Sequence, residues 1–419
     1  MKITFLGGTD SVGRSAILVE SEGTKLILDY GVALNHIPGF PAHIPPKDID
    51  GIILTHAHLD HTGAAPYFYV SRRIPLYLSS LTLEYTDLLL KDFLRLSGYY
   101  LPFETIEVEN MISSARIMEP GMDFEIGDFN VRFLNSGHIP GSVQVILEDS
   151  SGLRLLYTGD INDIDTRLLK GADLDYGKID VAIMEATYAG EEHPERAKLE
   201  KEFIEDVYNI LDNNGKVLIP AFSVGRAHEI LCILSAYNIE YPVYIDGMAV
   251  KAGEILLKHS SKLRDSGLFK KAWGMADWPS GWKDRKNILK KPCVIVSPAG
   301  MLKGGMAVFY MERLMGKHEN GIFLVSYQIP GTPGDILLKT GKFMVKGKAK
   351  QVKAKVKHFD FSSHAGHSGL VRIIEKIGKD AQIFLMHGEP DKMVKLQNLV
   401  EEKGYRCMRA DILKTYEVS

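Results

Sequence analysis

The chain has 419 residues, of which 45% are hydrophobic, and a formal net charge of −3 at pH 7. This length and hydrophobic content predict two globular domains and exclude a disordered protein. The small net charge produces no global field for a polyanion. Nucleic acid is therefore neither indicated nor excluded, and it would have to bind to local patches.

The cysteines and the N-terminus indicate the compartment. Cys232, Cys293 and Cys407 lie far apart without CxxC spacing, which suits a reducing compartment and argues against a cysteine-type zinc module. The N-terminal apolar run is too short for a signal peptide, and no stretch reaches the ~18 apolar residues of a membrane span. We therefore expect a cytoplasmic protein with no membrane partner.

The first part of the chain is predicted to form short strands that end in polar residues. The apolar runs KITFLGG, SAILVE, KLILDYG and GIILTHAH predict closely spaced strands. LTLEYTDLLLKDFLRLSGYY has helical spacing, and FNVRFLNSGH and LRLLYTGDIN predict two more strands. Because several of these strands end in His or Asp, the pattern indicates one shared site.

The middle of the chain has a different rhythm of strand, glycine-rich turn and helix. KVLIPAF precedes SVGRAHEILCIL, and CVIVSPAG precedes MLKGGMAVFYMERL. Such alternation predicts a parallel, doubly wound sheet. VKHFDFSSHAGH and AQIFLMHGEPD then resemble the first part of the chain again, because each is a predicted strand that leads into a histidine. We therefore predict one domain formed by residues 1–189 and 346–419, with a second domain, residues 190–345, inserted into it.

The sequence HAHLDH contains four metal-ligand side chains, His56, His58, Asp60 and His61. Two histidines two residues apart point to the same side of an extended segment. Imidazole and carboxylate ligands suit zinc or a similar divalent ion. A single histidine here could merely cap a strand, but four clustered ligands favour a metal site.

More ligands must come from distant strand ends. His138, Asp160 and His387 each follow an apolar run and lie beside glycine. Taken singly, each is as readily structural as functional, and together with HAHLDH they are predicted ligands.

The segments LTHAHLDHTG, NSGH and YTGD resemble the signature of the metallo-β-lactamase fold, a four-layer αββα sandwich. The resemblance implies two divalent metal ions, with zinc favoured over manganese or magnesium, which activate a hydroxide. It assigns His56, His58 and His138 to one ion and Asp60, His61 and His387 to the other, bridged by Asp160. Asp29 in LILDYG would orient a ligand histidine, with a turn-forming role as the alternative.

Three further segments, IMEATYAG, FSSHAGH and FLMHGEP, are similar to the motifs of the beta-CASP subfamily, nucleases with a Rossmann-like domain inserted in the lactamase domain. The family includes ribonuclease J and the cleavage and polyadenylation endonuclease. The resemblance implies an archaeal factor-like or ribonuclease J-like enzyme without KH domains.

In this family resemblance His364 is the candidate general acid, because the leaving alkoxide of a phosphodiester needs a proton. Glu185 would raise the pKa of His364, and Asp60 completes the catalytic residues. A loop histidine beside two serines is the alternative for His364. His367 has no motif support and is expected to be a helix-start or surface residue.

Strand-to-glycine turns in the inserted domain predict contacts with an RNA backbone, since helix N-termini favour anions. Taken alone, each turn is more often an ordinary connection between a strand and a helix. The residues are Ser223, Arg226, Ser297, Gly300, Ser326 and Tyr327, together with Ser362 and Ser363 beside the candidate acid. Lys353, Lys355 and Lys357 form an alternating stripe, interpreted as a charged edge strand or as a phosphate contact.

These features predict a metal-dependent ribonuclease that acts in RNA processing or decay, as an endonuclease, a 5′–3′ exonuclease or both. The predicted products carry a 5′-phosphate and a 3′-hydroxyl. RNA is the expected partner, and a homodimer or an RNA-processing complex is compatible with the sequence. The alternatives are a DNA-processing beta-CASP nuclease, a small-molecule hydrolase of the same fold, and a non-catalytic scaffold subunit, which should have lost ligands.

Overall fold

A computed structural model describes residues 1–34 and 37–418, which divide into two compact units. The first unit comprises Met1–Asp165, Gly171–Glu192 and Ser363–Ser419, and the second comprises Thr166–Lys170 and His193–Ser362. None of the helices in the described part of the chain is both long and apolar enough to span a bilayer.

The first unit contains two seven-stranded mixed sheets. One has the order β22-β1-β2-β3-β4-β5-β6. Its strands are β1 Lys2–Gly7, β2 Ala16–Ser21, β3 Thr24–Tyr30, β4 Gly51–Ile53, β5 Leu76–Leu78, β6 Ala115–Ile117 and β22 Thr415–Glu417. The other has the order β21-β20-β11-β10-β9-β8-β7. Its strands are β7 Asp123–Ile126, β8 Phe129–Asn135, β9 Val143–Glu148, β10 Arg154–Tyr157, β11 Val181–Glu185, β20 Gln382–Met386 and β21 Arg406–Arg409.

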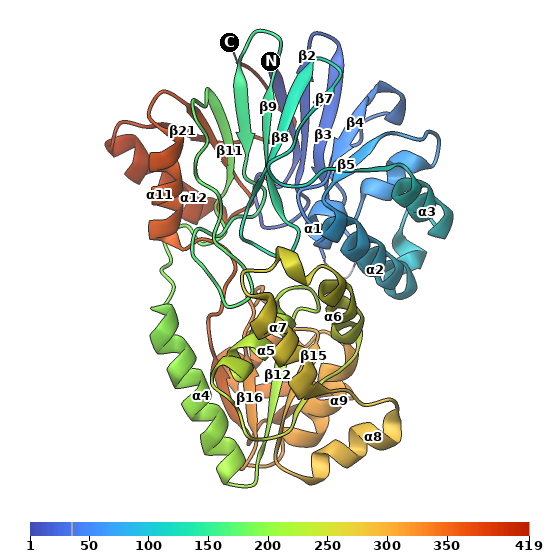
Figure 1. The fold of residues 1–419 in the computed structure, drawn as a ribbon, viewed down its shortest axis with the longest axis vertical. Helices are drawn as coiled ribbons and strands as arrows, with labels where there is room; N and C mark the ends of the chain where they lie inside the picture. The colour runs from blue at the N-terminus through green and yellow to red at the C-terminus, as the bar shows by residue number, and fades with distance from the viewer. Residues whose placement is uncertain (35–36, 419) are drawn as a thin grey trace. The chain divides into compact units, whose positions relative to one another are not determined.

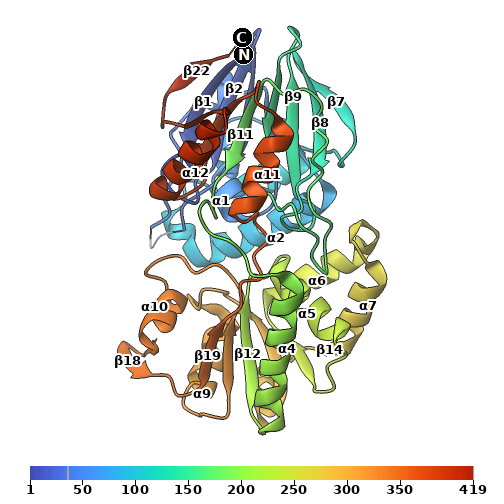
Figure 2. The ribbon, with the colours of Figure 1, turned by 90° about the vertical axis from the view of Figure 1, so that its left-hand side faces the viewer.

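Helices cover the outer face of each sheet. They are α1 Leu59–Thr62, α2 Ser80–Ser97, α3 Thr105–Ser113, α11 His367–Ile377 and α12 Pro390–Glu402, with short 3-10 turns at Pro46–Asp48, Ala65–Tyr69 and Gly98–Tyr100. The predicted helix in LTLEYTDLLLKDFLRLSGYY corresponds to α2, which begins where the Ser79 hydroxyl accepts a hydrogen bond from the Thr82 N–H. Figure 1 shows α2 and α3 on one side of the sheets and α11 and α12 on the other, and Figure 2 shows α11 and α12 from their own side.

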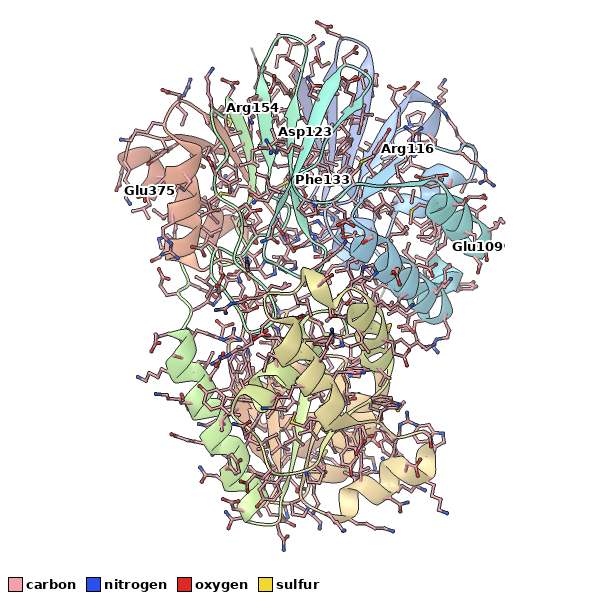
Figure 3. All side chains as sticks on the ribbon, viewed as in Figure 1. Glu109, Arg116, Asp123, Phe133, Arg154 and Glu375 are labelled. Atoms are coloured by element: carbon pink, nitrogen blue, oxygen red, sulfur yellow. The ribbon has the colours of Figure 1, made fainter. Side chains whose placement is uncertain are left out.

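Three separate hydrophobic clusters confirm the four layers of the predicted αββα sandwich. One cluster lies between the sheets and joins residues such as Phe5 of β1 to Phe133 of β8. A second packs the outer face of the first sheet against helix residues such as Phe93. The third packs the second sheet against Leu370 and Leu396. In Figure 3, Phe133 lies among the strands, whereas the charged side chains of Asp123 and Glu375 lie outside.

The second unit is built on a six-stranded, fully parallel sheet of order β14-β13-β15-β12-β16-β19. Its strands are β12 Lys216–Ala221, β13 Val243–Ile245, β14 Ala276–Asp277, β15 Cys293–Pro298, β16 Gly321–Leu324 and β19 Lys355–His358, and a separate two-stranded ribbon pairs β17 Lys342–Val345 with β18 Lys348–Gln351. The predicted alternation of strands and helices is therefore confirmed.

Helices cover both faces of this parallel sheet. They are α4 Arg196–Asp212, α5 Arg226–Ala236, α6 Met248–Lys258, α7 Ser266–Met275, α8 Trp282–Asn287, α9 Gly305–Leu314 and α10 Pro333–Thr340, with short 3-10 turns at Ser260–Lys262 and Ile288–Lys290. The chain moves in one direction along the sheet from β12 to β14 and in the other from β14 to β19. Because such crossovers are right-handed, α5 to α7 lie on one face and α8 to α10 on the other.

The second unit is longer at its C-terminal end than the sequence prediction. Residues 346–362, which were assigned to the first domain, belong to the second unit. The reason is the strand Lys355–His358, which pairs in parallel with Gly321–Leu324 and completes the edge of the parallel sheet. Residues Thr166–Lys170 also join the second unit, although they lie within the predicted first segment.

The sandwich core predicts a large effect for Phe133→Ala. Phe133 is fully buried, and its ring centroid lies 5.1 Å from that of Phe124. Its removal should lower the free energy of unfolding by about 3–5 kcal/mol, because the cavity cannot fully collapse. Chemical denaturation followed by circular dichroism measures the change. Leu96→Ala is the control, since Leu96 is 73% exposed. Equal stability of the two variants would contradict the assigned core.

Candidate metal centre

The HAHLDH loop follows β4 and leads into α1. The Asp29 carboxylate fixes its start, because it accepts hydrogen bonds from the Thr55 N–H and the Thr55 hydroxyl, both at 2.8 Å. The Ser15 N–H donates to the Asp60 carbonyl at 2.9 Å and holds the other end. The loop is therefore anchored to β2 and β3, which lie beside β4 in the same sheet.

The remaining candidate ligands come from the second sheet. Asp160 follows β10 and His387 follows β20, while Glu185 is the last residue of β11. These three strands run parallel and are neighbours, so their carboxyl ends share one edge. His138 follows β8, which runs in the same direction as β10 because β9 is antiparallel to both. The fold thus brings together the strand ends that the sequence singled out.

The side chains meet around the Asp160 carboxylate. Nitrogens of His61 and His387 lie 3.3 Å from one of its oxygens, and nitrogens of His56 and His138 lie 3.5 Å from the other. His58 Nδ1 lies 3.2 Å from His138 Nε2, and Asp60 Oδ2 lies 3.3 Å from His387 Nε2. The potential ligand atoms form overlapping groups. One group contains His56, His58, His138 and Asp160, and another contains His61, Asp160 and His387. Asp60 forms a further group with His56 and His61.

The chemistry of these groups fits divalent cations. Burial lowers the pKa values of His56, His58 and His138, so these rings are neutral near pH 7, as metal ligands must be. Despite burial, the neighbouring histidines hold the pKa of Asp160 well below its ordinary value. His56 Nε2 is buried and makes no hydrogen bond with any residue that the structure describes. A cation would satisfy both this nitrogen and the Asp160 carboxylate.

Hydrogen bonds to the backbone and to Asp29 set the orientation of two rings. His138 Nδ1 donates to the Ser363 carbonyl at 2.8 Å, and His61 Nδ1 donates to Asp29 Oδ2 at 2.7 Å. In both rings Nε2 faces Asp160, and in the neutral His138 it carries the lone pair. Burial opposes a charge on His61, but Asp160 and Asp29 raise its pKa above the ordinary value. The Asp29 carboxylate thus contacts His61, a candidate ligand, and the φ of Asp29 is 55°, an uncommon backbone conformation for a residue other than glycine.

His364 and Glu185 form a pair next to this cluster. His364 Nδ1 lies 2.8 Å from Glu185 Oε1, and His364 Nε2 lies 4.0 Å from Asp160 Oδ2. Glu185 is buried and also accepts hydrogen bonds from the N–H groups of Ile161 and Thr187. Burial opposes a charge on His364, but Glu185, Asp160 and Asp60 together raise its pKa to about 9. In the absence of a bound cation, this imidazole is protonated at neutral pH.

Three supporting residues were missed by the sequence analysis. Tyr157 donates its hydroxyl to Asp29 Oδ2 at 2.9 Å, and the Thr187 hydroxyl donates to the His387 carbonyl at 3.1 Å. Thr55 contacts both Asp29 and the His56 ring. Thr55 and Tyr157 lie inside the quoted motifs LTHAH and LYTGD, so motif position was the available signal. His367 begins α11, as expected, and its Nδ1 accepts a hydrogen bond from the Gly190 N–H.

The predicted phosphate-contact residues of the second unit also gather at strand ends. Ser223 and Arg226 follow β12, Ser297 and Gly300 lie at the end of β15, and Ser326 and Tyr327 follow β16. Strand β12 pairs with both β15 and β16, so the three ends are adjacent. A side-chain carbon on Gly300 would lie 2.8 Å from Ser326 Oγ, so a larger residue there would force Ser326 to shift. The hydroxyls of Ser297 and Ser326 are buried and form no hydrogen bond with the described residues.

The two remaining predicted contacts, Ser362 and Ser363, are partly buried and flank the boundary between the units, one on each side. The lysine stripe matches the edge-strand interpretation, since β19 ends the sheet. Lys355 and Lys357 both form ion pairs with Asp206, and Lys357 also pairs with Glu202 at 3.0 Å. These acidic groups of α4 neutralise much of the stripe.

The sandwich with its His and Asp cluster defines a metal-dependent hydrolase, and comparison with known proteins specifies the kind. Residues 10–171 match the metallo-beta-lactamase superfamily, residues 227–337 the Beta-Casp domain, and residues 350–410 the Zn-dependent metallo-hydrolase RNA specificity domain. The chain belongs to the beta-CASP ribonucleases of archaea, a family of metal-dependent hydrolases.

Relatives support this membership over nearly the whole chain. RNase aCSPSF2 of Saccharolobus solfataricus is 39% identical over 96% of this chain and 82% of its own length. Probable RNase MJ4 of Methanocaldococcus jannaschii is 35% identical over 97% of both chains. The transcription termination factor FttA of Pyrococcus horikoshii is 32% identical over 96% of this chain and 68% of its own.

A solved structure of a protein of unknown function from Enterococcus faecalis superimposes with a TM-score of 0.65 at 14% identity, covering 100% of this chain and 99% of that chain. At this identity the likeness supports the fold alone.

Gly31 gives a test of how the ligand loop is placed. A side-chain carbon at Gly31 would lie 1.7 Å from the Asp60 carbonyl and 2.5 Å from the His61 N–H. Gly31→Ala should therefore displace Asp60 and His61 and lower the metal content of the purified protein, measured by elemental analysis. Gly98→Ala is the control, because no atom lies within 4 Å of its added carbon. Full metal content in Gly31→Ala would contradict this placement.

Proposed function

We propose that this chain hydrolyses RNA phosphodiester bonds at the cluster around Asp160 and leaves a 5′-phosphate and a 3′-hydroxyl. The observation that carries the proposal is the His364–Glu185 pair, in which an imidazole that contacts a buried carboxylate at 2.8 Å lies 4.0 Å from the Asp160 carboxylate. The leaving 3′ oxygen departs as an alkoxide and needs such a proton donor. Relatives that are named as RNases support RNA over DNA, and the complete set of ligand side chains argues against a scaffold.

The donor atoms suit two divalent ions, for which zinc is the best match to imidazole and carboxylate ligands. His56, His58 and His138 would hold one ion, Asp60, His61 and His387 the other, and Asp160 would serve both. When bound, such ions supply the acidity that makes water a nucleophile near neutral pH and the positive charge that stabilises the reacting phosphate.

The residues beside the ligands would handle the proton. Glu185 accepts a hydrogen bond from the Nδ1–H group of His364 and so favours the imidazolium form. His364 Nε2 would then donate its proton to the leaving 3′ oxygen. Asp29 holds His61 in the tautomer whose Nε2 faces Asp160. None of these steps needs a covalent intermediate with the protein.

The strand-end turns of the second unit would bind the RNA backbone. Ser223, Ser297 and Ser326 are buried or nearly so, and the hydroxyls of Ser297 and Ser326 have no hydrogen-bond partner among the described residues. Arg226 opens α5 and would offer its guanidinium to a phosphate, since the first N–H groups of this helix already donate to backbone carbonyls. Ser362 and Ser363, which precede His364 in the chain, are proposed as further phosphate contacts. A cytoplasmic location and a homodimer or RNA-processing complex remain predictions.

Asp160→Ala and His364→Ala should both abolish cleavage, but for different reasons. Asp160→Ala removes the carboxylate shared by the ligand sets and should also lose bound metal. His364→Ala should keep its metal and lose about 10²- to 10⁴-fold in rate, the usual range for a general acid. The assay uses internally labelled RNA with a 5′-triphosphate or 5′-monophosphate and DNA of the same sequence. The product lengths distinguish internal cleavage from 5′ exonuclease action.

A modified substrate isolates the role of the proton. When sulfur replaces the bridging 3′ oxygen at one linkage, the leaving group no longer needs protonation. His364→Ala should then recover much of its rate at that linkage, whereas Asp160→Ala should not. Wild-type activity of His364→Ala on normal RNA, or cleavage of DNA alone, would refute the proposal.

Glu185→Gln should reduce cleavage of normal RNA by about 10- to 100-fold, because a neutral amide stabilises the imidazolium of His364 less than a carboxylate does. Glu185 acts through His364, so the loss should again disappear on the sulfur-containing substrate. Glu192→Gln is the matched control, since Glu192 is exposed and accepts a hydrogen bond from the Ser368 N–H. An unchanged rate in Glu185→Gln would argue that His364 does not depend on this carboxylate.

A further inference from the structure

A large aromatic side chain is exposed on the second unit. Trp282, the first residue of α8, is 58% exposed. Its ring centroid lies 5.2 Å from that of Phe309 on the neighbouring helix α9, and the guanidinium of Arg313 lies 3.6 Å above Phe309. Figure 1 shows α8 beside α9 at the periphery of this unit. Trp282, Phe309 and Arg313 thus form a continuous row, here named the Trp282 platform.

Contacts with Arg285 and Asp246 hold the Trp282 platform in place. Arg285 lies 5.5 Å from the Trp282 ring centroid and binds Asp246 through two hydrogen bonds of 2.7 and 2.6 Å. Asp246 is buried and accepts a third hydrogen bond from the Tyr310 hydroxyl at 2.7 Å. Because Arg285 is committed to Asp246, the position of Trp282 is set before any ligand binds, which lowers the entropic cost of binding.

Unpaired positive charge surrounds the platform. Lys283, Lys286, Lys290 and Lys291 are all exposed on α8 and the turn that follows it, and none forms an ion pair with a residue that the structure describes. Two acidic residues lie on the same helices, namely Asp284, which accepts a hydrogen bond from the Ser280 hydroxyl, and Glu312. The balance on this surface is clearly positive, although the whole chain carries a net charge of −3.

An exposed aromatic ring amid lysines has a specific ligand class. Protein interfaces deplete lysine at their centres, so four unpaired lysines disfavour a protein partner. Single-stranded nucleic acid, by contrast, is bound by aromatic faces on which bases stack and by cations that contact the phosphates. We propose that the Trp282 platform is an accessory binding surface for single-stranded RNA, in which a base stacks on Trp282 and the lysines contact the adjoining phosphates.

This inference rests on the proposed function, because it assumes that RNA is the substrate. It concerns other residues than the strand-end turns and the metal ligands. The platform would retain RNA segments outside the reacting bond, so it should affect binding of long substrates more than turnover. Its aromatic contact tolerates any base, since every base offers a flat face.

The test measures the affinity of the full, metal-loaded protein for a cleavage-resistant phosphorothioate RNA by fluorescence anisotropy. Trp282→Ala should weaken binding roughly tenfold, within the range known for the loss of one base stack, while Trp282→Phe should stay close to wild type. The triple variant Lys283→Gln, Lys286→Gln and Lys290→Gln should lower the slope of log affinity against log salt by about 2, given ~0.7 per phosphate contact on a single strand.

The controls remove an aromatic ring that is even more exposed than Trp282, or exposed lysines elsewhere. Tyr99→Ala, at a position that is 95% exposed in the first unit, and the pair Lys376→Gln and Lys395→Gln should leave both affinity and salt slope unchanged. On cleavable RNA, Trp282→Ala should raise KM for long substrates and leave kcat unchanged.

Each outcome decides the inference. Unchanged affinity in both Trp282→Ala and the lysine variant overturns it, and the proposed function survives if the wild type still cleaves RNA. A change of oligomeric state in Trp282→Ala at constant RNA affinity, seen by light scattering, overturns it in favour of a second copy as the occupant. Failure of the wild type to bind or cleave RNA overturns the proposed function itself, which separates the two failures.

Discussion

Five histidine side chains approach one buried carboxylate, and the rest of the site depends on this convergence. His56, His61, His138, His364 and His387 each place a ring nitrogen within 4.0 Å of Asp160. Four of these five rings have pKa values that the surroundings shift strongly, downward for His56 and His138 and upward for His61 and His364. The Asp160 anion is buried beside the neutral rings of His56 and His138, and a bound cation would complete the compensation of its charge.

Both sheets must be in place before Asp160 can be surrounded in this way. His56 and His61 come from the loop after β4, whereas Asp160 and His387 follow parallel neighbours in the other sheet. The inter-sheet core that contains Phe133 therefore fixes the distances within the site as well as the stability of the sandwich. Interiors packed at crystal-like density transmit small displacements, so ligand positions inherit the rigidity of the core.

The insertion of the second unit is compatible with a precise site because its two ends are held. Glu185 and His364 are 179 positions apart and share a hydrogen bond of 2.8 Å. In the first unit the Gly190 N–H donates to His367, and in the second unit His193 Nδ1 lies 2.6 Å from Asp360. These hydrogen bonds fix the chain near both ends of the insertion. The length of the insertion therefore has little influence on the site, since the entropy of loop closure rises only slowly with length.

The chain also enters the second unit briefly after Asp160. The chain enters the second unit at Thr166 and leaves it after Lys170. Within that unit the Glu229 carboxylate accepts hydrogen bonds from the N–H groups of Arg167 and Leu168 at 3.0 and 2.7 Å. Glu229 belongs to α5, the helix that Arg226 opens. These bonds hold the segment Thr166–Lys170 to α5 within the second unit, which the sequence pattern did not indicate.

The sequence was informative where local pattern and chemistry coincide, and it failed where tertiary partners decide. Strand ends with His or Asp were recognised because each apolar run is followed directly by its ligand, as in YTGD. The boundary at 346 was misplaced because Lys355–His358 is a polar edge strand, whose pairing with Gly321–Leu324 leaves no hydrophobic signature. Tyr157 was missed because its hydroxyl meets Asp29 only across the sandwich.

The lysine-rich segment of the second unit also shows that tertiary partners cannot be read from the sequence. Between Asp335 and Asp360 the chain contains eight lysines and no acidic residue, which on sequence alone is the strongest candidate for a polyanion surface. The fold pairs Lys339 with Asp335, and Lys355 and Lys357 with Asp206. The other lysines of this segment form no ion pair with a described residue, and the same holds for the lysines beside Trp282. The shorter cluster differs because the fold places an exposed aromatic face next to it. Whether a basic segment can attract a phosphate therefore depends on the neighbours that the fold gives it, more than on its composition.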